Sequence, residues 1–146
     1  MSAVDFLDSN VLLYLFDQTD ARKRSIAEGI FRRAAEDGTA VISHQVVQET
    51  LNVVTRKIKP ALTADDARRV LTHLLVPLWR VMPSLSLYER ALTLQARQGF
   101  SFYDSLIVAA ALESGCSRLL TEDLQHGQRI DGLTIENPFL ASAAGP

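Results

Sequence analysis

Short apolar runs alternate with amphipathic stretches along the whole chain, and this alternation limits the fold more than any other feature of the sequence. Strands that alternate with helices form a parallel sheet covered on both faces. We therefore expect an α/β protein, a three-layer α/β/α sandwich with a central, mainly parallel sheet. The predicted strands are residues 3–7, 39–43, 79–82, 118–121 and 133–136, and the predicted helices are residues 11–16, 21–36, 45–58, 63–76, 86–98 and 102–114.

The length and composition of the chain suit one domain. With 146 residues and 47% hydrophobic content, we place this domain at residues 1–140 and expect a disordered tail at 141–146. The 15 Lys and Arg residues against 17 Asp and Glu residues exclude a uniformly basic nucleic-acid-binding protein. The longest apolar run, Leu106–Leu112, has seven residues, whereas a membrane helix needs about 20. Acidic Asp5 and Asp8 stand where a secretory leader would be cationic and then apolar, and the single Cys116 forms no internal disulfide, so we expect a cytoplasmic protein.

Acidic residues follow the predicted strands, at the edge where a parallel sheet binds its ligands. Asp8 ends the first strand, Asp123 follows the fourth, and Asp104 lies in the first turn of the last helix. Glu49 lies at the boundary of the apolar stripe of its helix, from which a side chain can point into a crevice. Like charges roughly 4 Å apart repel by about 4 kcal/mol at an effective dielectric of ~20, so four acids in one cleft need cations or raised pKa values. Oxygen ligands select hard cations such as Mg²⁺ or Mn²⁺.

Each of these acids also has a purely structural interpretation. Asp104 fits a capping box with Ser101, and Asp8 fits an N-cap at the start of the following helix. Glu49 fits a solvated helix residue, and Asp123 fits an ordinary acid of a polar loop that we expect over residues 122–131. The combination of all four at strand and helix ends favours a functional site over four separate structural roles.

Four ordered segments together resemble the PIN-domain nucleases and, more narrowly, the VapC-type toxins of bacterial toxin-antitoxin pairs. The segments are Phe6–Tyr14, Val47–Glu49, Phe102–Ile107 and Leu120–Asp123. The resemblance extends from about Val4 to Leu140, with the segments in the order of the family. It implies a small α/β/α domain, cleavage of RNA with one or two Mg²⁺ or Mn²⁺ ions, a homodimer, and a small antitoxin protein that blocks the cleft.

The resemblance also implies roles for individual residues. Asp8, Glu49, Asp104 and Asp123 match the catalytic, metal-binding acids of the family, with Glu122 and Asp131 as nearby alternatives to Asp123. Ser9 and Asn10 match the polar position beside the first acid, where a side chain positions the substrate. The carboxylates would hold cations that activate water for in-line attack on a phosphodiester, so no histidine is expected to be catalytic.

Two other functions remain open from the sequence. An aspartyl-phosphate phosphatase would use Asp8 as its nucleophile and an acid two residues later, where this chain has Asn10, whose amide cannot transfer the proton. A non-catalytic binding module would use the acidic cleft to dock a basic partner segment. Clustered basic residues either form a local rim for RNA phosphates or are solvated helix faces; they are Arg22–Arg24, Arg32–Arg33, Arg56–Lys59 and Arg68–Arg69.

Overall fold

A computed structural model of the protein describes residues 4–140, and the tail expected at 141–146 lies outside the described residues. The strands are β1 (Asp5–Leu7), β2 (Ala40–Ser43), β3 (Trp79–Val81), β4 (Arg118–Leu120), β5 (Arg129–Ile130) and β6 (Leu133–Glu136). The α-helices are α1 (Ser9–Leu13), α2 (Ala21–Asp37), α3 (His44–Arg56), α4 (Ala64–Arg69), α5 (Leu85–Gln98) and α6 (Phe102–Glu113). A 3-10 helix, η1 (Tyr14–Phe16), extends α1, and a π-helix, η2 (Val70–Leu75), extends α4.

The strands form one sheet in the order β3-β2-β1-β4-β6-β5. All neighbouring pairs are parallel except β5 and β6, which are antiparallel. The chain runs outward from β1 through β2 to β3 and then returns to place β4 on the other side of β1. In open, mainly parallel sheets, ligands bind beyond the carboxyl ends of the strands at such a reversal. The predicted mainly parallel sheet is confirmed, and its reversal point lies between β1 and β4.

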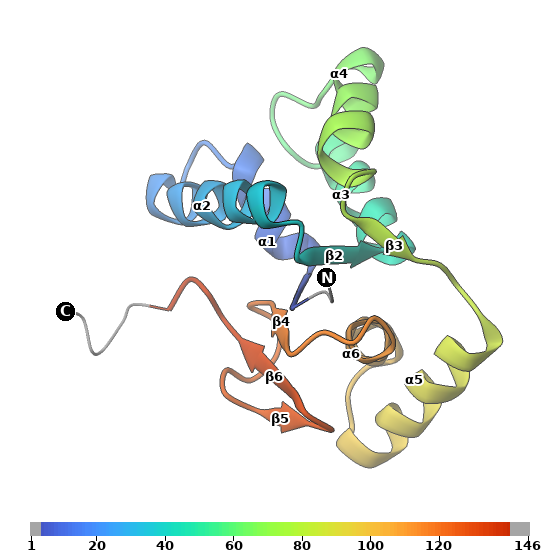
Figure 1. The fold of residues 1–146 in the computed structure, drawn as a ribbon. Helices are drawn as coiled ribbons and strands as arrows, with labels where there is room; N and C mark the ends of the chain where they lie inside the picture. Colours follow the sequence, from blue (N-terminus) through green and yellow to red (C-terminus); the bar gives the residue numbers. More distant parts are fainter. Residues whose placement is uncertain (1–3, 141–146) are drawn as a thin grey trace.

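Helices cover the two faces of this sheet in two groups. Figure 1 shows α1 to α4 on one side of the sheet and α5 with α6 on the other. Helix α6 is apolar all round and carries seven buried residues, from Ser105 to Ala111, so it forms the centre of its layer. The helices on both faces confirm the predicted three-layer sandwich.

The described residues include no helix that is both long enough and apolar enough to cross a membrane.

Side chains cap the starts of five helices, and the cap at Ser101 is one that the sequence predicts. The side chains of Asp20, Ser43, Thr63, Ser84 and Ser101 each accept a hydrogen bond from the amide three residues later, at the start of α2 to α6. Each cap satisfies an amide that has no partner within its helix. At the other end of α2, Gly38 adopts a left-handed conformation with φ 66°, which stops the helix before β2.

Three predicted elements differ in detail from the structure. The loop expected over residues 122–131 contains β5, which turns back on β6 through Asp131 and Gly132, both with positive φ. An Asp-Gly pair between apolar residues is a hairpin signal, but a strand of two residues such as β5 is too short to show a strand pattern in the sequence. The helices expected at 11–16 and 63–76 end in 3-10 and π geometry rather than in α geometry.

An ion-pair brace closes the amino edge of the sheet. Arg118 at the start of β4 donates two hydrogen bonds of 2.7 Å to the Asp5 carboxylate on β1. It also donates to Glu136 on β6 at 3.2 Å. Arg118 thus links three adjacent strands; its pair with Asp5 lies at the edge opposite to the acidic residues, whereas Glu136 is the last residue of β6.

Leu119→Ala is expected to lower the free energy of unfolding by about 3 kcal/mol, because Leu119 is fully buried on the central strand β4 and its loss leaves a cavity. Urea denaturation measures the change. Leu140→Ala is the matched control, since Leu140 is 51% exposed, and should cost less than about 1 kcal/mol. Equal losses in the two variants would contradict the described core.

Candidate active site

Asp8 lies at the carboxyl end of β1 and is 5% exposed. Its Oδ1 accepts a 2.8 Å hydrogen bond from the Ser9 amide, which makes it the cap of α1. Its Oδ2 accepts a 2.8 Å hydrogen bond from the hydroxyl of Thr121, which follows β4. The backbone amide of Asp8 donates to the Leu120 carbonyl. Asp8 therefore joins the ends of β1 and β4 at the reversal point of the sheet.

Asn10 and Thr121 extend this connection into the loop after β4. The Asn10 amide donates to Thr121 Oγ1 at 3.2 Å and lies 3.5 Å from Asp8 Oδ2. Its oxygen accepts from the Glu122 backbone amide at 3.2 Å. Thr121 Oγ1 also accepts from the Asp123 amide at 3.1 Å. Thr121 was not identified from the sequence, although a polar residue directly after a buried strand was the available signal.

Glu49 approaches the same place from α3. The Ser9 hydroxyl donates to Glu49 Oε1 at 3.1 Å, so Ser9 bridges Glu49 and Asp8. Gln45, one turn earlier on α3, donates to Glu49 Oε2 at 3.5 Å and to the Tyr103 carbonyl at 3.2 Å. Gln45 thereby connects α3 to the start of α6, a contact between residues 58 apart that sequence patterns did not predict.

Asp104 and Asp123 complete the acidic group. Asp104 lies in the first turn of α6, where its amide donates to the Ser101 hydroxyl at 3.1 Å, so the predicted cap exists together with the site. Burial raises the pKa of Asp104, a hydrogen bond with Ser101 lowers it, and the charge of Asp123 raises it. The charge of Asp123 also raises the pKa of Asp8. Asp123 is therefore close enough to influence both carboxylates.

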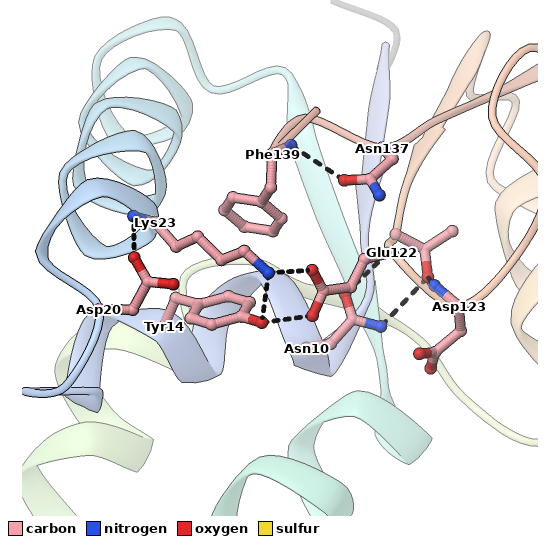
Figure 2. Close-up of polar contacts among 9 residues, drawn as sticks. Asn10, Tyr14, Asp20, Lys23, Glu122, Asp123, Asn137 and Phe139 are labelled. Atoms are coloured by element: carbon pink, nitrogen blue, oxygen red, sulfur yellow. Dashed lines mark hydrogen bonds and ion pairs between the residues drawn. The ribbon is translucent and has the colours of Figure 1, made fainter. Parts of the chain in front are cut away.

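The other two acids considered for this loop face elsewhere. Glu122 accepts hydrogen bonds from Lys23 and from the Tyr14 hydroxyl, on the side away from the Asp123 carboxylate (Figure 2). Asp131 pairs with Arg97 of α5 at 3.5 Å. Of the three loop acids, only Asp123 thus acts on the Asp8 group.

Uncompensated negative charge is the main electrostatic property of this site. Burial raises the pKa of Asp8 from 3.8 to about 7, with smaller increases from Glu49 and Asp123 and opposing hydrogen bonds from Thr121 and Ser9. Within residues 4–140, no Lys or Arg forms an ion pair with Asp8, Glu49, Asp104 or Asp123. An oxygen-only set of acids without a counter-cation fits a hard divalent cation.

The acidic side chains do not form a closed ligand shell. In the part of the chain that the structure describes, no three His, Cys, Asp or Glu side chains are grouped closely enough to hold an ion as they stand. Carboxylates that repel one another stay apart until a cation offsets their charge. The residues therefore fit a hard cation by their chemistry and by their shared edge, and binding would have to draw them together.

A cavity of about 470 Å³ adjoins this site. Its walls include Asn10, Tyr14 and Glu122, which belong to the hydrogen-bond network described above. The rest of the lining is mostly apolar or lies on the segments before α2 and after α3; it comprises Leu13, Phe16, Asp17, Gln18, Thr19, Val53, Ile58 and Lys59. The cavity therefore places an apolar surface next to the acidic group.

Comparison with known proteins identifies the family. The family model of the PIN domain matches residues 6–131, which is most of the chain and includes all four acids. The chain belongs to the PIN domain family. A search of curated proteins gave no match.

Solved structures share the PIN domain architecture of this chain. A toxin-antitoxin complex from Klebsiella pneumoniae is 20% identical, with a TM-score of 0.65 over 94% of this chain and 98% of that one. DNA-bound VapBC from Salmonella typhimurium is 19% identical, with a TM-score of 0.64 over 92% and 97%. VapC20 of Mycobacterium tuberculosis, described as a toxin that cleaves the sarcin-ricin loop, is 23% identical, with a TM-score of 0.59 over 82% and 91%. At these identities the likeness shows the fold.

Asp8→Asn is expected to make this PIN domain more stable at neutral pH in EDTA. Because the folded pKa of Asp8 is raised to about 7, the native state holds a proton that the unfolded chain releases near its ordinary value of 3.8. The stability of the wild type therefore falls as pH rises between these values and levels off above about 7. Asparagine does not ionise and has no such pH-dependent loss, so we expect its free energy of unfolding to exceed that of the wild type by about 1–3 kcal/mol at pH 7.5.

Thermal unfolding of both proteins at pH 4 and pH 7.5 measures this difference. Asp65→Asn, which removes one partner of an exposed ion pair, is the matched control and should change stability by less than about 0.5 kcal/mol. An Asp8→Asn protein that is less stable than the wild type at pH 7.5 would show that the Asp8 carboxylate is not disfavoured by its surroundings.

Proposed function

We propose that this protein is a metal-dependent endoribonuclease that hydrolyses RNA phosphodiester bonds and acts as the toxin of a toxin-antitoxin pair. The observation that supports it most is the group of four acids without a counter-cation at the reversal point of a PIN-domain sheet. The VapC20 neighbour is described as an RNA-cleaving toxin, and other neighbours are VapBC or toxin-antitoxin complexes. Carrying this activity over to the present chain is part of the proposal.

We assign Asp8, Glu49, Asp104 and Asp123 to cation binding and catalysis. Asp8 supplies a fixed, buried carboxylate, Glu49 brings a carboxylate from the second turn of α3, and Asp104 brings one from the first turn of α6. When bound, one or two Mg²⁺ or Mn²⁺ ions would supply activation of water and stabilisation of negative charge on the phosphodiester. Ser9 orients Glu49, and Asn10 orients the loop after β4 that carries Asp123. Both residues would therefore help to position the substrate indirectly, by fixing the acids that bind the cation.

Basic residues after α3 are the best candidates for contacts with RNA phosphates. Arg56, Lys57 and Lys59 are exposed, and Lys59 lines the cavity beside the acidic group. By contrast, Arg68 and Arg69 each pair with an aspartate one turn earlier. Contacts of this kind hold the RNA backbone without selecting a sequence.

An antitoxin protein is the partner we propose, with the apolar cavity beside the acids as its docking surface. Apolar partner side chains would enter next to Leu13, Phe16 and Val53, and a basic partner group would reach the uncompensated carboxylates. A partner seated there would offset the charge that otherwise attracts a cation and would block the route to the acids.

The two rival functions receive less support. A phosphatase would need a proton donor two residues after Asp8, and Asn10 there is an amide whose oxygen and nitrogen both have hydrogen-bond partners. A docking module without catalysis would not need a cation. Metal binding therefore separates a nuclease from a docking module.

Purified protein with Mn²⁺ is expected to cut total bacterial RNA into discrete fragments, and EDTA should abolish the cleavage. Asp8→Asn and Asp104→Asn should each lower the cleavage rate by at least about 100-fold. Removing a residue that only hydrogen-bonds to a metal ligand already lowers activity by about 10- to 100-fold, and these variants alter the proposed ligands themselves. Asp65→Asn should cleave as the wild type does. A folded protein free of antitoxin that neither cuts RNA nor shows an Asp8-dependent Mn²⁺ site by calorimetry would leave the docking module as the better assignment.

A homodimer also belongs to this proposal. Helix α5 carries a second apolar stripe, Leu85, Tyr88 and Leu92, which the rest of the described chain leaves exposed. Met82, between β3 and α5, is exposed as well. Figure 1 shows α5 at the periphery of its layer, packed on α6. Exposed apolar side chains at helical spacing are typical of an interaction surface, and we assign this one to a second copy of the chain.

Leu92→Glu is expected to raise the dissociation constant of the dimer at least about 10-fold, because a charge would be buried in the apolar contact. Light scattering over a range of protein concentrations measures the mass. The control is Leu140→Glu, at another exposed leucine, which should leave the dimer intact. A wild type that is monomeric at high concentration would contradict the assignment of the α5 stripe.

A further inference from the structure

Lys23 of α2 is held against the loop that carries Asp123. Its ammonium donates to Glu122 Oε2 at 2.9 Å and to the Tyr14 hydroxyl at 3.1 Å. The same ammonium lies 4.9 Å from the centre of the Tyr14 ring and 5.7 Å from that of Phe139. The Tyr14 hydroxyl donates to Glu122 as well, and the two rings pack edge to face 4.7 Å apart. Side chains from η1 and α2 thus converge on Glu122, and Phe139 from the segment after β6 packs against both of them (Figure 2).

Glu122 is fixed through both its backbone and its side chain. Its amide donates to Asn10, and its carboxylate accepts from Lys23 and Tyr14. Further along the loop, His126 Nδ1 accepts from the Asn137 amide at 3.0 Å. The loop that begins after β4 therefore has anchors on both sides of Asp123.

The carboxylate of Asp123 has no such anchor. Across residues 4–140, no side chain or amide donates a hydrogen bond to it, and no cation pairs with it. Figure 2 shows it pointing away from Lys23, Tyr14 and Glu122. Its position therefore follows from the backbone of Asp123, which is held by Thr121 and by the residue before it, Glu122.

The Lys23 and Glu122 side chains are 28% and 22% exposed, and an isolated pair near the surface contributes little to stability. The pair is also neutral, so it does not offset the charge of the acidic group. The pair can therefore affect the acidic group mainly through geometry, by fixing the position of the loop that carries Asp123. Residues that orient a metal ligand without touching the ion change metal affinity by about 10- to 100-fold.

We propose that Lys23 is a positioning residue for the cation site: it holds Glu122 and, through Glu122, sets the direction of the Asp123 carboxylate. The inference rests on the proposed metal-dependent function. It concerns a residue of α2 that contacts none of the four acids through a hydrogen bond or an ion pair.

Titration calorimetry with Mn²⁺ alone tests this role. The double variant Lys23→Met/Glu122→Gln removes one positive and one negative charge, so it keeps the net charge of the wild type while the ion pair is lost. We expect its Mn²⁺ affinity to fall about 10-fold. Lys23→Arg, which retains the cation, should bind Mn²⁺ within about 3-fold of the wild type. Hydrogen exchange of the metal-free double variant should be faster at residues 122–125.

Arg118→Met is the matched control, because it removes an ion pair at the opposite edge of the sheet. It should leave Mn²⁺ affinity unchanged even if it lowers stability. An affinity of the double variant within about 2-fold of the wild type would overturn the proposal. An equal loss in Arg118→Met would overturn it too, since the effect would then be a general loosening of the sheet.

Failure of this inference is distinguishable from failure of the proposed function. If the wild type shows no Mn²⁺ site that Asp8→Asn removes, the metal-dependent function fails, and the role of Lys23 fails with it. If the wild type binds Mn²⁺ and cuts RNA while the double variant binds Mn²⁺ equally well, only the role of Lys23 is wrong.

Discussion

The Asp8 carboxylate is buried at the reversal point of the sheet, where the adjacent strands β1 and β4 end, and the acidic site is arranged around it. Its two oxygens accept from Ser9 and Thr121, so the ends of the two strands are held at one place. Burial alone would favour a neutral acid, and the charges of Glu49 and Asp123 add to this. The site therefore concentrates negative charge where the fold can least solvate it.

This arrangement costs stability and makes the site receptive to cations. Carboxylates whose pKa is raised by burial, those of Asp8 and Asp104, are kept where no Lys or Arg of the described chain pairs with them. A bound divalent ion would remove this repulsion, so the free energy lost on folding becomes part of the affinity for the ion. The same logic applies to a basic segment of a partner protein, which would compete for the same charge.

Cations of the chain are paired around the site rather than in it. Lys23 forms an ion pair with Glu122, Arg97 with Asp131, and Arg118 with Asp5 at the opposite edge of the sheet. Each pairing leaves its acid unavailable to an ion. Asp123, by contrast, keeps an unpaired carboxylate on a loop whose ends are fixed by hydrogen bonds. Of the three acids on this loop, Glu122 and Asp131 are paired with basic residues, and only Asp123 keeps a carboxylate that is free to bind a cation.

The sequence by itself determined the layers, the strand-helix order and the edge at which the acids lie, because hydrophobic periodicity and helix caps are local properties. The caps Asp8 of α1 and Ser101 of α6 were predictable for the same reason. Only the tertiary structure shows that Glu122 is paired while the Asp123 carboxylate is not, since the pairing depends on Lys23, which is 99 residues away from Glu122 in the chain. It also decided the raised pKa of Asp8 and the bridging roles of Thr121 and Gln45, because burial and long-range contacts have no local sequence signal.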